Sequence, residues 1–261
     1  MIKFMIRLLS AIIFLTLTID AGVYIKSVDI HGDNPKENTS NIFIEKDRIR
    51  VQMETPEQFS VIIFRHDKQV MWMIDEQNKT YSEITKDDLA ELKKRMDSAQ
   101  AMMAEQMKNL PAEQRQMMEQ MMKKQMQQMP SMEKPKIEYK KAGQEKIEQW
   151  PCTKYEGFVD GKKTSDVWAV SWDKLGFSAD DFEGLKHMGE FFEVLNQKSE
   201  EFFNLETFQG LPVKIQDYEN GKLRSKTQIK EITAKNCESS LFELPSGLTK
   251  KDLMPGNMEE M

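Results

Sequence analysis

The chain has 261 residues, of which 31% are charged, and a formal net charge of -6 at pH 7. Such a length provides for one substantial hydrophobic core, and the composition is that of a folded, mildly acidic protein. An acidic balance without a basic cluster argues against a nucleic acid as partner.

Residues 1–21 have the three parts of a secretory signal peptide. Lys3 and Arg7 precede an apolar run, Leu8–Ile19, and the small residues Ala21 and Gly22 follow. This run is shorter than the stretch of about 20 apolar residues that crosses a bilayer. We therefore expect cleavage near residue 21, with retention as an anchor as the alternative. The mature protein is expected to be periplasmic or secreted and at most peripheral to the membrane.

Residues 22–84 have the pattern of a β meander. Short runs rich in Val, Ile, Phe, Tyr and Trp are separated by polar turn residues, which predicts about five antiparallel strands. Between Ile42 and Val51 the apolar residues alternate with charged ones. This alternation predicts that one face of the sheet contacts water.

Residues 85–130 change to helical spacing and predict a methionine-rich helical pair. Thr85 and Asp88 resemble a capping box at the start of the first helix, and Pro111 separates it from the second. Eleven of the 20 methionines lie between Met96 and Met132. The content of this segment is therefore the most unusual feature of the chain.

Residues 136–250 predict a second β region with one helix. Asp160-Gly161 and Asn220-Gly221 are two-residue hairpin signals between alternating strands. An apolar stripe at helical spacing predicts a helix over 178–204, and residues 251–261 are expected to form a flexible tail.

The order of these elements predicts the fold class. Strands in runs, with helices inserted between them, indicate an α+β protein and not a parallel sheet. We expect a single domain over 22–250, built on a curled antiparallel sheet. A sheet of about 10–11 strands must curl, and helices are expected to cover its concave face.

Several strings resemble a family of exported bacterial proteins known as domain-of-unknown-function family 4412. They are DRIRV (47–51), VMWMIDEQNKTYSEI (70–84), LPAEQRQMMEQMM (110–122), WPCTKYEGFVDGKKTSDVWAVSW (150–172) and LFELPSG (241–247). The strand order and the late FELPSG also resemble the periplasmic lipoprotein carrier LolA. That resemblance implies an unclosed barrel plugged by helices, with an acyl chain in the cavity between them, but no catalytic residues.

The sequence lacks the common catalytic signatures. It contains no GxSxG, no HExxH, no phosphate loop and no Cys beside a His at workable spacing, so we expect no enzyme and no cofactor. Asp29, His31 and Asp33 alternate at the end of the first strand. A lone His among polar residues at a strand end is usually solvated, so no metal site is predicted.

Cys152 and Cys237 are the two cysteines of the chain. In an oxidising compartment an even pair favours a disulfide, which we expect to join the two ends of the second β region.

The methionines allow three hypotheses. Met is flexible and common on surfaces that adapt to varied apolar partners, so the helical pair is expected to form a pliable lid over an acyl chain, lipid or lipoprotein-like ligand. The alternatives are Cu(I) binding through the thioethers and an envelope assembly factor that binds a protein partner. The residues predicted to line the groove are Met103, Met107, Met118, Met121, Met122, Met126, Phe191 and Phe192.

Overall fold

The computed structural model describes residues 21–32, 34–55, 58–108, 137–195 and 205–252, and the expected signal peptide, second methionine-rich helix and distal tail lie outside them. The strands in chain order are β1 (Gly22–His31), β2 (Asn34–Glu45), β3 (Arg48–Glu54), β4 (Phe59–Arg65), β5 (Val70–Asp75), β6 (Thr80–Thr85), β7 (Glu138–Ile147), β8 (Trp150–Val159), β9 (Lys162–Ser171), β10 (Gly210–Glu219), β11 (Lys222–Lys235) and β12 (Thr249–Lys250). The helices are α1 (Lys86–Lys108), α3 (Trp172–Leu175), η1 (Asp180–Phe182), α4 (Glu183–Phe192), α5 (Leu205–Phe208) and η3 (Ser239–Phe242).

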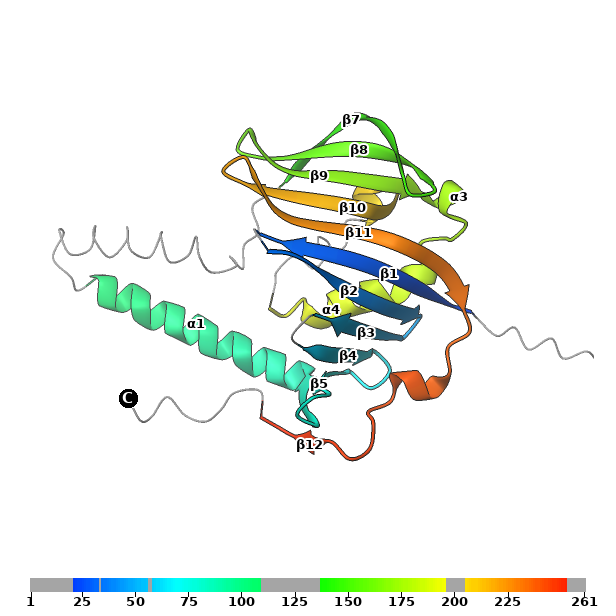
Figure 1. Ribbon diagram of the computed structural model, residues 1–261. Coiled ribbons are helices and arrows are strands. Elements are labelled where there is room, and N and C mark those ends of the chain that lie inside the picture. The colour runs from blue at the N-terminus through cyan, green and yellow to red at the C-terminus, as the bar shows by residue number, and fades with distance from the viewer. Residues whose placement is uncertain (1–20, 33, 56–57, 109–136, 196–204, 253–261) are drawn as a thin grey trace, which may run out of the picture.

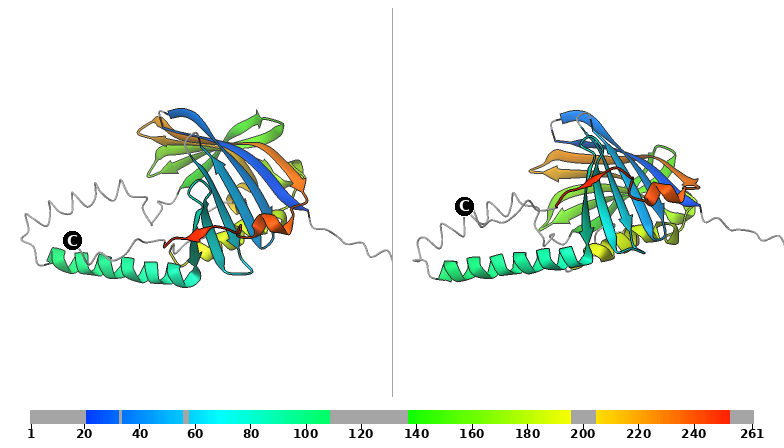
Figure 2. Two further views of the ribbon diagram at one scale, coloured as in Figure 1. Left: turned by 60° about the horizontal axis from the view of Figure 1, so that its bottom comes forward. Right: turned by 90° about the horizontal axis from the view of Figure 1, so that it is seen from below.

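All twelve of these strands belong to one sheet, in the order β12-β6-β5-β4-β3-β2-β1-β11-β10-β9-β8-β7. The β1–β6 meander and the β7–β11 meander are joined where β1 pairs antiparallel with β11, and β12 adds to β6 as a parallel edge strand. The sheet curls without closing (Figures 1 and 2). The expected α+β class with an unclosed antiparallel sheet is confirmed, with twelve strands instead of 10–11.

The two hairpin signals form the turns that their chemistry predicts. Asp160 and Gly161 have φ of 49° and 75°, and Asn220 and Gly221 have φ of 52° and 77°. These left-handed values match the twist of the flanking strands, which is why Asp-Gly and Asn-Gly are favoured at two-residue turns.

Part of the concave face of the sheet is covered by η1 and α4. Phe182 and Phe191 are buried there in one cluster with residues as distant in the sheet as Phe64 of β4 and Cys152 of β8. A Cβ atom at Gly184 would lie 2.3 Å from the carbonyl oxygen of Glu45, so glycine is needed for α4 to pack this closely on β2. The expectation of helical cover on this face is therefore met by α4 (Figure 1).

The opposite face of β2–β5 is covered by the segment that follows β11. Phe242 of η3 is fully buried against Phe43, Val61 and Ile63. Arg50 is also buried and donates to the carbonyl oxygen of Leu241 at 2.9 Å. The expectation of a water-facing side between Ile42 and Val51 is therefore wrong in this part of the sheet, because a segment distant in sequence covers it.

Helix α1 begins where the sequence predicts and then leaves the sheet. Asp88 accepts hydrogen bonds from the backbone N–H and the hydroxyl of Thr85, at 2.8 and 2.6 Å, as a capping arrangement requires. Leu89 in the first turn is buried, whereas Met102 is 68% exposed. Figures 1 and 2 show the helix projecting away from the sheet, so α1 does not cover the concave face. None of the helices in the described part of the chain is long and apolar enough to cross a membrane.

The expected disulfide is absent: Cys152 and Cys237 are both free, buried thiols. Cys152 belongs to the core beneath α4, and Cys237 belongs to the core on the opposite face, beneath η3. A covalent bond would have to pass through the sheet, which the sequence spacing could not reveal.

The two thiols are expected to react slowly with a thiol reagent in the native protein and to give two equivalents in denaturant without reductant. Burial raises the pKa of Cys152 to about 11 and raises that of Cys237, so little reactive thiolate exists at neutral pH. A spectrophotometric thiol titration measures both values. A denatured sample with no titratable thiol would show instead that Cys152 and Cys237 form a disulfide.

Candidate apolar ligand site

Directly paired residues form rows across the concave face of β1–β6. The row beneath α4 is buried throughout and consists of Val23, Ile44, Ile49, Phe64, Met71 and Ile84. Its members pack against η1 and α4 in the main core. This row stabilises the fold and is closed to a ligand.

The neighbouring row is apolar but only partly covered. Ile42 pairs with Val51, Val51 with Ile62, and Ile62 with Met73, across β2, β3, β4 and β5. The first three residues are half-buried against the main core, and Met73 is 39% exposed. Three gaps of about 4.8 Å between strands give this row a length of about 14 Å. We call these four residues the apolar row.

The third row changes to polar chemistry. Met53 pairs with Ser40 and Ser60, and Ser60 pairs with Asp75. The concave face therefore passes from a closed core through a half-exposed apolar strip to a polar rim within five residues along each strand. Such a gradient suits an amphipathic ligand, since its chain can lie on the apolar row while its polar end meets the rim.

Helix α4 supplies aromatic side chains beside these rows. The ring of Phe191 packs edge to face on Phe64 and on Phe192, with centroids 5.3 and 5.2 Å apart. Phe191 is fully buried, whereas Phe192 and Leu195 are half-buried against the same core as the apolar row. Phe192 can thus contact a ligand, but Phe191 is part of the core.

The other predicted groove residues lie wholly or in part outside the described residues. Met103 and Met107 lie on α1, and their side chains fall outside the described residues, as do Met118, Met121, Met122 and Met126 entirely. Their contact with a ligand stays a prediction.

The apolar row was missed by sequence reasoning. Alternation marks Ile42 and Val51 as facing the interior. The same pattern also marks Ile44 and Ile49, the next pair on that face of the sheet. Only the position of α4 distinguishes the closed row from the half-exposed one.

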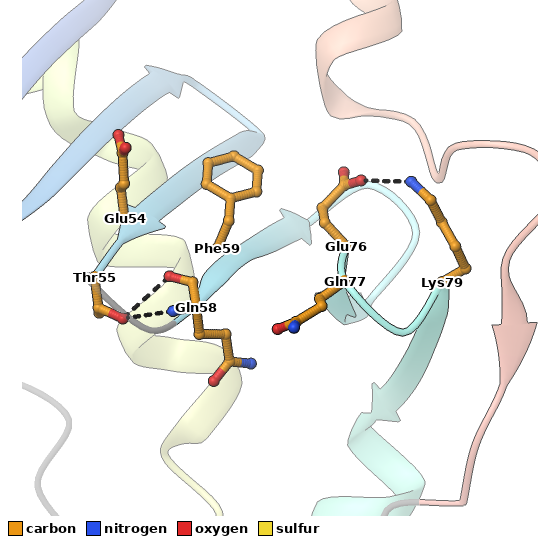
Figure 3. A pocket seen from close by; sticks show the side chains of 7 residues that line it. All are labelled: Glu54, Thr55, Gln58, Phe59, Glu76, Gln77 and Lys79. Atoms are coloured by element: carbon orange, nitrogen blue, oxygen red, sulfur yellow. Dashed lines mark hydrogen bonds and ion pairs between the residues drawn. The ribbon is translucent and has the colours of Figure 1, made fainter.

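Two other features give no binding site for a small molecule or metal. A depression of about 610 Å³ is open, and the residues that line it are mostly polar or charged: Glu54, Thr55, Gln58, Phe59, Glu76, Gln77 and Lys79 (Figure 3). The second feature is the group of alternating Asp and His residues at the end of β1. Asp29 accepts a hydrogen bond from Thr227 at 2.5 Å, and His31 is exposed. Asp33 lies outside the described residues.

The family model described as "Domain of unknown function (DUF4412)" matches residues 91–248, more than half of the chain. The chain belongs to the DUF4412 family. The family resemblance expected from the sequence is thereby confirmed. A comparison of this DUF4412 member with curated proteins gives no match.

Several solved structures are similar to this DUF4412 protein at low identity. An uncharacterized conserved protein from Thermus thermophilus has a TM-score of 0.46 and 9% identity, with 90% of this chain and 92% of that chain covered. MucB in the Pseudomonas aeruginosa MucA/MucB complex has a TM-score of 0.38 and 8% identity, covering 85% of this chain and 56% of that chain. A LolA superfamily protein from Nitrosomonas europaea has a TM-score of 0.30 and 9% identity, with coverages of 87% and 91%. The DUF4412 chain thus spans little more than half of the length of MucB.

Proposed function

We propose that this DUF4412 protein is an exported, non-enzymatic binding protein that carries an acyl chain on the concave face of its sheet. The observation that carries the proposal is the apolar row, which is continuous across four strands yet not closed by α4. The secretory character of residues 1–21 favours the periplasm or the outside of the cell, where acyl chains of lipids and lipoproteins are the available apolar partners.

The energetics of such a site favour a chain-like ligand. Each methylene removed from water contributes about 0.8 kcal/mol, so a chain along the row gains affinity in proportion to the length it buries. The sheet backbone beneath the row is already paired on both sides, which leaves side-chain packing as the source of affinity. Binding is therefore expected to depend on chain length more than on the chemistry of the head group.

The test measures uptake of cis-parinaric acid by the delipidated full chain, followed by its displacement with fatty acids of increasing length. Native mass spectrometry of protein taken from its own compartment shows whether an acyl adduct is already present. Displacement that strengthens with chain length supports the proposal. Neither an adduct nor uptake of the probe would overturn it.

A matched pair of variants locates the site. Met73→Asp is expected to weaken probe binding by at least about tenfold, because a carboxylate on the row removes the apolar contact of roughly two methylenes, worth about 1.6 kcal/mol. Leu223→Asp is the control, since Leu223 is also an exposed apolar residue on a strand, at 46%, but lies in the β10–β11 hairpin. Equal losses in the two variants would place binding elsewhere.

A further inference from the structure

Three side chains with metal-binding chemistry meet at one end of the sheet, although they are far apart in sequence. Asp47 lies in the turn between β2 and β3, His66 follows β4, and His187 lies on α4. One ring nitrogen of each His and one carboxylate oxygen of Asp47 all lie within 4.8 Å of one another. The two imidazole rings are stacked, with centroids 3.9 Å apart and planes 16° from parallel.

The spacing of these atoms is close to that of a zinc ligand set. The Oδ1 atom of Asp47 is 3.2 Å from Nδ1 of His66 and 3.5 Å from Nδ1 of His187. Two ligands of a tetrahedral zinc ion, each about 2.0–2.1 Å from the metal, are about 3.3 Å apart. The atoms are therefore close to ligand spacing. The stacked imidazole rings must still turn so that both nitrogens point to one ion, because imidazole binds a metal in the plane of its ring. Two imidazoles and one carboxylate form a donor set typical of Zn²⁺ with an open fourth position.

The surroundings hold the donors in place. The carbonyl oxygen of Lys46 lies 2.9 Å from Nδ1 of His187, and the backbone N–H of His66 donates to the carbonyl oxygen of Asp47 at 2.8 Å. In the metal-free protein Nδ1 of His187 therefore donates to this carbonyl, and it must release that hydrogen bond to bind the ion. Glu183 places a carboxylate oxygen 3.7 Å from Nε2 of His187, and it is paired with the exposed ammonium group of Lys46 at 3.3 Å.

We propose that Asp47, His66 and His187 bind a Zn²⁺ ion that fastens α4 to the β2–β3 and β4–β5 turns. Water supplies the fourth ligand. Because α4 forms one side of the concave face, the ion fixes the helix that limits access to the apolar row. The metal site does not depend on acyl-chain binding, so either proposal can fail without the other.

The test titrates Zn²⁺ alone into untagged, metal-free full chain by calorimetry. One equivalent is expected to bind, and the thermal midpoint is expected to rise, since a ligand that binds only the folded state stabilises it. The same site loaded with Co²⁺ is expected to give the visible absorption of a tetrahedral ion. An absence of stoichiometric binding would overturn the proposal.

The three histidines of the chain provide an internal control. We expect Zn²⁺ binding to be at least about tenfold weaker in each of the variants Asp47→Asn, His66→Gln and His187→Gln. A tenfold loss is the smallest effect typical of removing a residue that only supports a metal ligand, and loss of a ligand itself should cost at least as much. His31→Gln is expected to leave affinity and the thermal shift unchanged, because His31 is exposed at the far end of β1. Asp47 is a partly exposed turn residue, so its variant folds even if a histidine variant does not. An effect of His31→Gln equal to the others would show a merely adventitious surface site.

Discussion

Replacing Phe242 with alanine is expected to lower the free energy of unfolding by about 3–5 kcal/mol, the range for a phenylalanine removed from a packed core. Phe242 is fully buried, and it anchors the segment after β11 on the outer face of β2–β5. The guanidinium of Arg48 also lies 4.8 Å from the centre of its ring. Alanine would leave a cavity under η3 and would loosen the cover that keeps Val61 and Ile63 from water.

Chemical denaturation monitored by circular dichroism measures this loss. Phe59→Ala is the matched control, because Phe59 lies on the same strand face as Val61 but is 38% exposed, and its loss is expected to cost less than about 0.5 kcal/mol. A Phe242→Ala protein as stable as Phe59→Ala would show that the C-terminal segment does not belong to the folded core.

The variant Arg65→Ala is expected to lose about 2–3 kcal/mol of unfolding free energy, the contribution of hydrogen bonds to charged partners at a buried site. The buried guanidinium donates to Asp67 at 2.8 and 2.6 Å, to Glu243, and to the carbonyl oxygen of Phe242 at 3.3 Å. Asp67 and Glu243 are partly exposed and regain water when the arginine is removed, which keeps the loss below that of a fully buried pair.

This loss is also expected to depend on pH. The hydrogen bond from Arg65 lowers the pKa of Asp67, and hydrogen bonds from Lys68 and Arg65 lower that of Glu243. A carboxyl with a lowered pKa stabilises the fold above its unfolded pKa, and this contribution disappears as pH falls through the folded value. The difference between wild type and Arg65→Ala should therefore be constant near neutral pH and should narrow below about pH 4.

Denaturation curves from pH 7 to pH 3 measure that difference. Arg95→Ala is the matched control, because Arg95 is exposed on α1 and pairs with Glu91 one helical turn away. Its loss is expected to be about 0.3–0.5 kcal/mol. A difference between wild type and Arg65→Ala that widens as pH falls would contradict the assignment of the lowered pKa values to the folded state.

The sequence by itself determined the local structure of this protein. Asp160-Gly161 and Asn220-Gly221 specify hairpin turns because only residues that tolerate positive φ fit them, and Thr85 with Asp88 specifies the start of α1 because the capping hydrogen bonds are local. The change from a period of two to helical spacing likewise distinguishes strands from helices, so the α+β class and the curled antiparallel sheet could be predicted.

Only the tertiary structure decided which faces of these elements are covered. Periodicity shows that a residue such as Val51 points to one face, but which segment lies over that face depends on contacts between residues far apart in the chain. Hence Arg50 is buried by Leu241, Cys152 and Cys237 lie on opposite sides of the sheet, and α1 leaves the concave face to α4. The meeting of Asp47, His66 and His187 has the same origin, because the curl of the sheet around α4 brings together positions that share no spacing in the sequence.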